Sequence, residues 1–242
     1  MCYDNAMEKN ETSKKTYEFI VERIKSDILA GKLKTGDRLP PERELARQFS
    51  ASRTSIREAI KTLEILGVTE SVQGSGNYIA GNHHKSLTES MSMMFLLQKI
   101  DSLQISQLRE ALETKAALLA VENITASQLE HMESLVAELA LSSDEERSAT
   151  LDKELHYTLA RASGNLIIIQ VLDTLSELIN IYIKDRRKEI LSDSHNAARL
   201  QRIHSDIVSG LKNRDPDLTY RAVTEHFKII AEHIRGNPAI LG

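Results

Sequence analysis

The chain has 242 residues, of which 41% are hydrophobic and 27% charged; this composition is typical of globular proteins, and the length predicts two domains. The formal net charge is -4, and an aromatic content of 4% without Trp argues against the stacking surfaces of proteins that bind single-stranded nucleic acid. Cys2 is the only cysteine, which excludes an intrachain disulfide and a cysteine-based zinc cluster.

No apolar run is long enough for a signal peptide or a membrane helix, so we expect a cytoplasmic protein without a membrane partner. Residues 1–15 are polar and predict a disordered N-terminal arm. From residue 16 onward, Ile20, Val21, Ile24 and Ile28 recur with helical spacing. They predict a first helix that stops near Gly31.

Two further helices and a hairpin follow up to residue 80. A second helix is predicted to start at Pro41, and a third spans residues 53–66 between Ser52 as N-cap and Gly67 as terminator. A three-residue turn between two helices is typical of a helix-turn-helix. The stretch 68–80, with glycines at its tip, predicts a β-hairpin. Residues 16–80 are therefore expected to form a winged helix-turn-helix domain.

The third helix has the pattern of a DNA-recognition helix. Its apolar residues fall on one face, whereas Arg53 and Arg57 lie four positions apart on the opposite face, near the end that meets base edges. Residues 38–61 contain six Lys and Arg residues against three Glu residues, a local charge of +3. Any amphipathic helix has a charged solvated face, but the helix spacing and the wing favour DNA binding.

Residues 36–46, 52–60 and 74–76 resemble the DNA-binding domain of GntR-type transcriptional regulators. One departure is Pro41, where the family often has a capping Ser. The resemblance implies that the DNA contacts come from the two helices and that the wing lies near the minor groove. The expected DNA-binding residues are Arg43, Ser52, Arg53, Thr54, Ser55, Arg57, Gly74, Ser75 and Gly76.

After a polar linker at residues 81–86, residues 87–236 predict an all-α domain. The expected helices cover residues 87–98, 103–122, 126–142, 145–162, 165–191, 196–212 and 216–234. Their apolar faces have to be buried on one another, which predicts an antiparallel bundle with room for a ligand. The fold class is thus mainly α.

Four inward-facing polar residues of this bundle form a candidate metal site. Asp152 and His156 share one side of a helix, and His204 and His226 lie beside apolar residues of two later helices. Three imidazoles and a carboxylate can bind a divalent transition metal. The alternatives are hydrogen-bonded core histidines and a simple helix pair between Asp152 and His156.

The second domain is similar to the effector domain of the FadR subfamily, called the FCD domain. The similarity rests on Arg109 with Glu113, on residues 152–156 leading to Asn165, and on His204 and His226. It implies that Asp152 and the three histidines hold a metal, with zinc expected first and nickel or manganese as alternatives. It also implies a small carboxylate effector that contacts Arg109 and Asn165. A structural ion pair is the other interpretation of Arg109.

These patterns predict a transcriptional regulator, expected to be a repressor, that binds a short palindromic operator in double-stranded DNA as a homodimer. A small organic acid would alter its operator affinity. Two alternatives stay open from the sequence. One is a metal-dependent hydrolase or lyase that uses the same His and Asp residues, and the other is a repressor that senses the metal itself.

Overall fold

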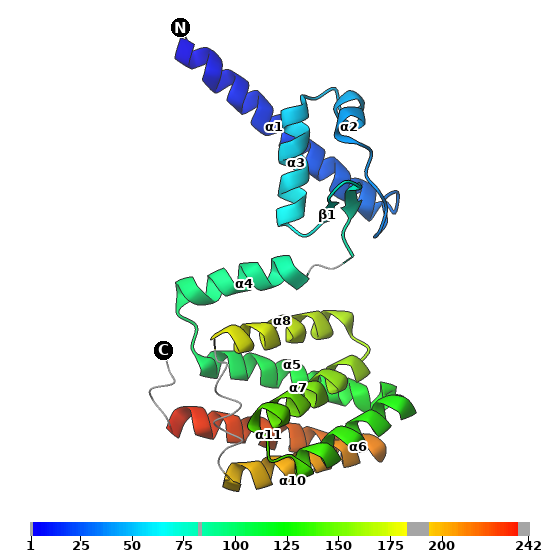
Figure 1. Ribbon diagram of the computed structural model, residues 1–242, viewed down its shortest axis with the longest axis vertical. Helices are drawn as coiled ribbons and strands as arrows, with labels where there is room; N and C mark the ends of the chain where they lie inside the picture. The colour runs from blue at the N-terminus through cyan, green and yellow to red at the C-terminus, as the bar shows by residue number, and fades with distance from the viewer. Residues whose placement is uncertain (1, 82–83, 183–193, 237–242) are drawn as a thin grey trace. The chain divides into compact units, whose positions relative to one another are not determined.

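The computed structural model describes residues 2–81, 84–182 and 194–236 (Figure 1). The chain divides into two compact units, Met1–Ser90 and Met91–Gly242. The prediction of a small winged helix followed by a helical domain is confirmed. Among the helices described, none combines the length and the apolar character that a membrane span requires.

The first unit is a winged helix-turn-helix. Its helices are α1 (Cys2–Leu29), α2 (Glu42–Gln48) and α3 (Arg53–Ile65), and its wing is formed by β1 (Thr69–Val72) and β2 (Gly76–Ile79). The two strands are antiparallel, with Thr69 opposite Ile79 and Val72 opposite Gly76. The apolar faces predicted for α1 and α3 are buried against each other in the core of this unit.

Helix α1 starts earlier than the sequence analysis expected. Residues 2–15, interpreted there as a disordered arm, continue the first helix. This stretch contains no Gly or Pro and is rich in Glu and Lys, which are good helix formers, so nothing in it stops the helix.

The predicted ends of the recognition helix are confirmed. The Ser52 hydroxyl accepts a hydrogen bond from the Ser55 amide at 3.0 Å, which caps the start of α3. At the other end Gly67 has a φ of 69°, the left-handed conformation that glycine adopts at little cost, and its amide bonds to the Glu64 carbonyl. Helix α2 begins after Pro41 without a side-chain cap, in keeping with the departure from the family pattern there.

The second unit is a helical bundle, as predicted. Its helices are α4 (His84–Gln98), which crosses the division between the units, α5 (Ser102–Asn123), α6 (Ala126–Leu141), α7 (Glu145–Ala162), α8 (Leu166–Tyr182), α10 (Ser194–Lys212) and α11 (Pro216–Gly236). Because α4 begins at His84, Lys85 and Ser86 belong to a helix instead of the expected linker. The predicted continuation of α8 to residue 191 lies outside the described residues.

Helices α5, α7, α10 and α11 surround the centre of this bundle. Helix α11 packs on α5 and α10, and α7 packs on α5, α6 and α8 (Figure 1). Leu155 and Leu159 of α7, Ile207 of α10 and Phe227 of α11 are buried in one apolar cluster. Polar side chains on the inward faces of these helices are thereby removed from solvent and held by rigid elements.

Candidate DNA interface and metal centre

The recognition helix presents its basic side chains to solvent. Arg53, Thr54 and Arg57 on α3 are exposed, as is Arg43 on α2, whereas the apolar face of α3 is buried in the core. The exposed residues thus remain available to phosphates and base edges, as the sequence predicted. In the chain without DNA, Arg57 Nε donates a hydrogen bond to the Glu42 carboxylate at 2.8 Å.

Ser52 and Ser55, at the start of α3, both form hydrogen bonds within the domain. Ser55 is only 2% exposed, and its hydroxyl lies 2.9 Å from that of Ser52. Ser55 therefore differs from the expectation of a DNA contact, because its side chain points into the domain and takes part in the cap. Ser52 is exposed, but its oxygen is engaged by the start of α3.

The tip of the wing is anchored to the loop before α2. Gly74 and Gly76 have φ values of 75° and 128°, so the turn uses backbone conformations that other residues rarely adopt. The Arg38 guanidinium donates a hydrogen bond to the Ser75 carbonyl, and the Ser75 hydroxyl lies 2.5 Å from the Tyr78 hydroxyl. Arg38 is not among the expected DNA-binding residues, because its contact with Ser75 depends on how the hairpin folds back.

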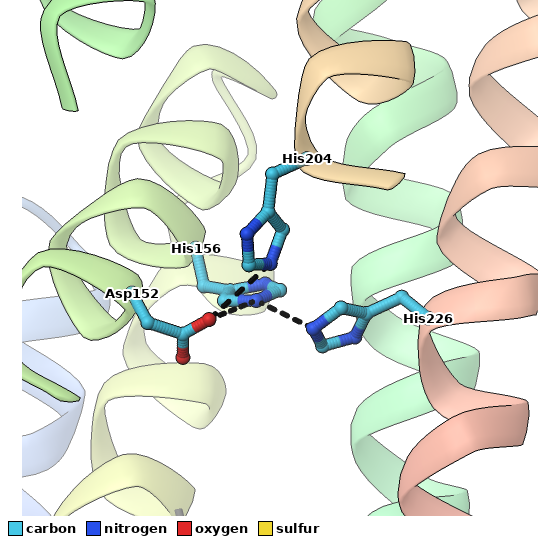
Figure 2. Close-up of side chains that lie close together, drawn as sticks. All are labelled: Asp152, His156, His204 and His226. Atoms are coloured by element: carbon cyan, nitrogen blue, oxygen red, sulfur yellow. Dashed lines mark hydrogen bonds and ion pairs between the residues drawn. The ribbon is translucent and has the colours of Figure 1, made fainter. Parts of the chain in front are cut away.

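The four candidate metal ligands come together in the second unit. Asp152 and His156 come from α7, His204 from α10 and His226 from α11, and all four side chains point toward one another (Figure 2). One donor atom from each residue lies within 4.8 Å of the others, and all four residues are buried. The sequence alone could give only the spacing within α7, so the convergence of three helices is the structural finding.

The nitrogen and oxygen atoms at the centre of the cluster are closely spaced. His204 Nε2 lies 3.2 Å from Asp152 Oδ1, and His156 Nε2 lies 3.2 Å from His226 Nε2 and 3.7 Å from the same carboxylate oxygen (Figure 2). Burial together with the positive charges of His156 and His204 holds the pKa of His226 well below its usual range. A lowered pKa favours the neutral imidazole, which is the form that binds metals.

This donor set fits a divalent transition metal. The buried His204 Nε2 lies 3.2 Å from the Asp152 carboxylate, but it forms no hydrogen bond within the described part of the chain. A buried nitrogen without a hydrogen bond is costly, and a cation at the centre of the cluster would satisfy it. Three imidazoles with one carboxylate are ligands suited to zinc and neighbouring ions.

Two buried charged residues of α5, Arg109 and Glu113, connect this helix to the cluster. Arg109 donates from Nε and Nη2 to Glu113 Oε1, and Glu113 Oε2 lies 2.6 Å from His156 Nδ1. Burial disfavours the Glu113 carboxylate, but Arg109 and His156 outweigh it and hold its pKa well below the usual range. Burial likewise disfavours the cation of His156, but Glu113 and Asp152 outweigh it and raise the pKa of His156 to about 9.

The two expected effector residues lie in different surroundings. Arg109 is buried and ion-paired to Glu113, which agrees with the structural interpretation of this residue. Asn165 is exposed, and its Oδ1 accepts hydrogen bonds from the amides of Ile167 and Ile168 at 3.1 and 3.2 Å. Asn165 therefore does not join the cluster, because it is the cap of α8.

A cavity of about 290 Å³ has His204 in its wall. It lies between the end of α6, the start of α7 and the first half of α10, and Ser142, Ser148 and Gln201 contribute polar groups to it. The other lining residues are small or aliphatic. A small solute can therefore approach one of the four clustered side chains from this side.

Comparison with known proteins identifies both units. Residues 16–79 match the bacterial regulatory proteins of the gntR family, and residues 104–228 match the FCD domain. The HTH-type transcriptional regulator LutR of Bacillus subtilis is 28% identical over 211 residues, which cover 86% of this chain and 96% of LutR. A putative L-lactate dehydrogenase operon regulatory protein of Escherichia coli is 25% identical over 215 residues, 87% of this chain and 83% of that protein.

Among solved structures, a GntR protein of Streptococcus agalactiae superposes with a TM-score of 0.65 at 26% identity, covering 90% of this chain and 99% of that one. The match thus extends over both units and over nearly the whole of the relative. With a winged helix in the first unit and an FCD domain in the second, the chain belongs to the GntR family of bacterial regulatory proteins and is a transcriptional regulator, not an enzyme.

Proposed function

We propose that this regulator binds a short palindromic operator as a homodimer and senses a small organic acid at a divalent metal in its FCD domain. Zinc is the ion that the ligand set favours, with nickel or manganese as alternatives. The observation that carries the proposal is the buried convergence of Asp152, His156, His204 and His226 from three helices. Such a regulator acts in the cytoplasm, where its DNA lies.

The DNA part of the proposal rests on the exposed basic face of α2 and α3. Arg53 and Arg57 are the side chains proposed to contact base edges in the major groove, and Arg43 is proposed to contact a phosphate. The wing, whose tip is held by Arg38, is proposed to contact the adjacent DNA backbone. A dimer of such units would bind two half-sites related by twofold symmetry, which is why we propose a palindrome.

The charges around the cluster favour an anionic effector. Asp152 and Glu113 contribute two buried negative charges, and Arg109 compensates one of them. A divalent ion bound by neutral imidazoles would leave a local excess of one positive charge. Such a centre would attract a carboxylate, and a bound metal would supply Lewis-acid affinity for its oxygen atoms. The E. coli relative named for the L-lactate dehydrogenase operon supports testing small carboxylates first.

Effector binding is proposed to change operator affinity by shifting the population of chain conformations. Helix α10 carries His204 and helix α11 carries His226, so a ligand at the metal acts on both helices. The energetic coupling is reciprocal, so operator DNA should change the effector affinity by the same factor.

The operator arm of the proposal is tested by gel shift at fixed salt on a promoter fragment. Arg53→Ala and Arg57→Ala should each abolish the specific complex, whereas Arg235→Ala, an exposed arginine on α11, should leave it intact. Unchanged operator binding in both α3 variants would show that the recognition helix has been assigned wrongly.

The effector arm is tested by a thermal-shift screen of two- to six-carbon carboxylates on metal-loaded protein, with His204→Ala as the comparison. A carboxylate that raises the melting temperature of the wild type alone supports the site. A response in His204→Ala without one in the wild type would contradict it. Operator release on chelation, in the absence of any carboxylate, would show instead that the metal is the signal.

A further inference from the structure

Glu113 has the environment of a residue that orients a metal ligand. It is 2% exposed and lies in the middle of α5, where its two carboxylate oxygens have different partners. Oε1 accepts from the Arg109 guanidinium, and Oε2 lies 2.6 Å from Nδ1 of His156. Glu113 itself is outside the group of donor atoms that converge on the centre of the cluster.

The contact with Glu113 decides which nitrogen of His156 is free to bind a metal. When it binds a metal, an imidazole is neutral and carries one proton, and the nitrogen without that proton is the ligand atom. With Nδ1–H donated to Glu113, the lone pair is on Nε2. That atom faces the cluster, 3.2 Å from His226 Nε2 and 3.7 Å from Asp152 Oδ1.

Arg109 holds the carboxylate in this position. Its guanidinium donates from two nitrogens to a single oxygen of Glu113, and its Cζ lies 5.4 Å from the ring centroid of Phe227 on α11. Phe227 follows the candidate ligand His226 in the sequence and is 1% exposed. The side chains of Arg109 and Glu113 thus connect α5 to α7 and α11, the two helices that carry three of the four candidate metal ligands.

We propose that Glu113, held by Arg109, is a positioning residue that orients His156 for metal binding. This inference rests on the proposed metal site and deepens it. It also changes the role assigned to Arg109 from the sequence, because its guanidinium stabilises the carboxylate beside the metal ligand. Hydrogen-bond partners of this kind typically change metal affinity by about 10- to 100-fold when they are removed.

The experiment compares Glu113→Gln with Glu122→Gln in chelator-stripped protein titrated with Co²⁺ and followed by visible absorption. Both substitutions remove one negative charge from α5, but Glu122 is exposed. We expect Glu113→Gln to weaken Co²⁺ affinity by about 10- to 100-fold, and Glu122→Gln to match the wild type. Circular dichroism of each metal-free variant establishes that it is folded.

A second measurement keeps the inference testable if Glu113→Gln does not fold. Nitrogen-15 NMR of the histidine rings in zinc-loaded wild type should show the His156 proton on Nδ1. Wild-type Co²⁺ affinity in Glu113→Gln, or a His156 proton on Nε2, would overturn the positioning role and leave the metal site standing. Failure of the wild type to bind Co²⁺ or zinc would overturn both.

Discussion

Gly210 of α10 packs directly against Thr219 of α11, and Gly210→Ala should push the two helices apart. A Cβ at this position would lie 2.4 Å from Thr219 Oγ1, 2.9 Å from the Thr219 backbone N and 3.1 Å from its Cα. Two of these three atoms are backbone and cannot rotate away. Thr219 is also fixed at the start of α11, where its hydroxyl donates to the Asp215 carbonyl. The helices themselves must therefore move.

The expected change in the free energy of unfolding is the difference between two opposing effects. Overpacking a core costs roughly 1–3 kcal/mol, and this contact is severe enough for the upper half of that range. Replacing a helical Gly by Ala gains about 1 kcal/mol, so the net loss in free energy of unfolding is about 1–2 kcal/mol. For a unit of this size, each kcal/mol lowers the melting temperature by roughly 2–4 °C.

The assay is calorimetry of the metal-free protein, followed by Co²⁺ titration. Because His204 lies on α10 and His226 on α11, the separation should also weaken metal affinity. The matched control is Gly236→Ala at the end of α11, where a Cβ meets nothing within 4 Å and stability should not fall. A Gly210→Ala protein that melts at or above the wild-type temperature would refute the packing argument.

Three further substitutions test the first unit. Ser52→Ala removes the cap of α3 and should lower the free energy of unfolding of this unit by about 1 kcal/mol, measured by urea titration. Arg38→Ala releases the Ser75 carbonyl and should weaken operator binding in fluorescence anisotropy without lowering the melting temperature. Glu42→Gln frees Arg57 from an exposed ion pair that is worth at most about 1 kcal/mol. Operator affinity should therefore rise by up to about fivefold. Weaker operator binding would show instead that the ion pair positions Arg57 for DNA.

Local signals in the sequence were sufficient for most of the fold. Ser52 and Gly67 mark the two ends of α3 because a cap and a left-handed glycine act on neighbouring backbone groups. The N-terminal arm was harder, since residues 2–15 lack both an apolar stripe and a helix breaker. The polarity of these residues suggests disorder, whereas their helix propensity favours a helix. In the structure α1 extends through residues 2–15.

The four candidate metal ligands could be predicted from the sequence, but the residues that contact them could not. Asp152 and His156 lie one helical turn apart, so their common face follows from the sequence alone. The link from Glu113 to His156 joins residues 43 positions apart, and no local pattern specifies it. Asn165 is the opposite case: its hydrogen bonds are local to the start of α8, whereas its expected effector contact rests on the family resemblance alone.

The most direct test of the account is elemental analysis of the purified chain beside its Asp152→Ala and His226→Ala variants, with circular dichroism to establish that all three are folded. The account predicts about one divalent transition metal ion per wild-type chain, reloadable after chelation, and loss of most of that metal in both variants. A folded wild type that takes up no zinc, nickel or manganese, or variants that retain the metal in full, would contradict it.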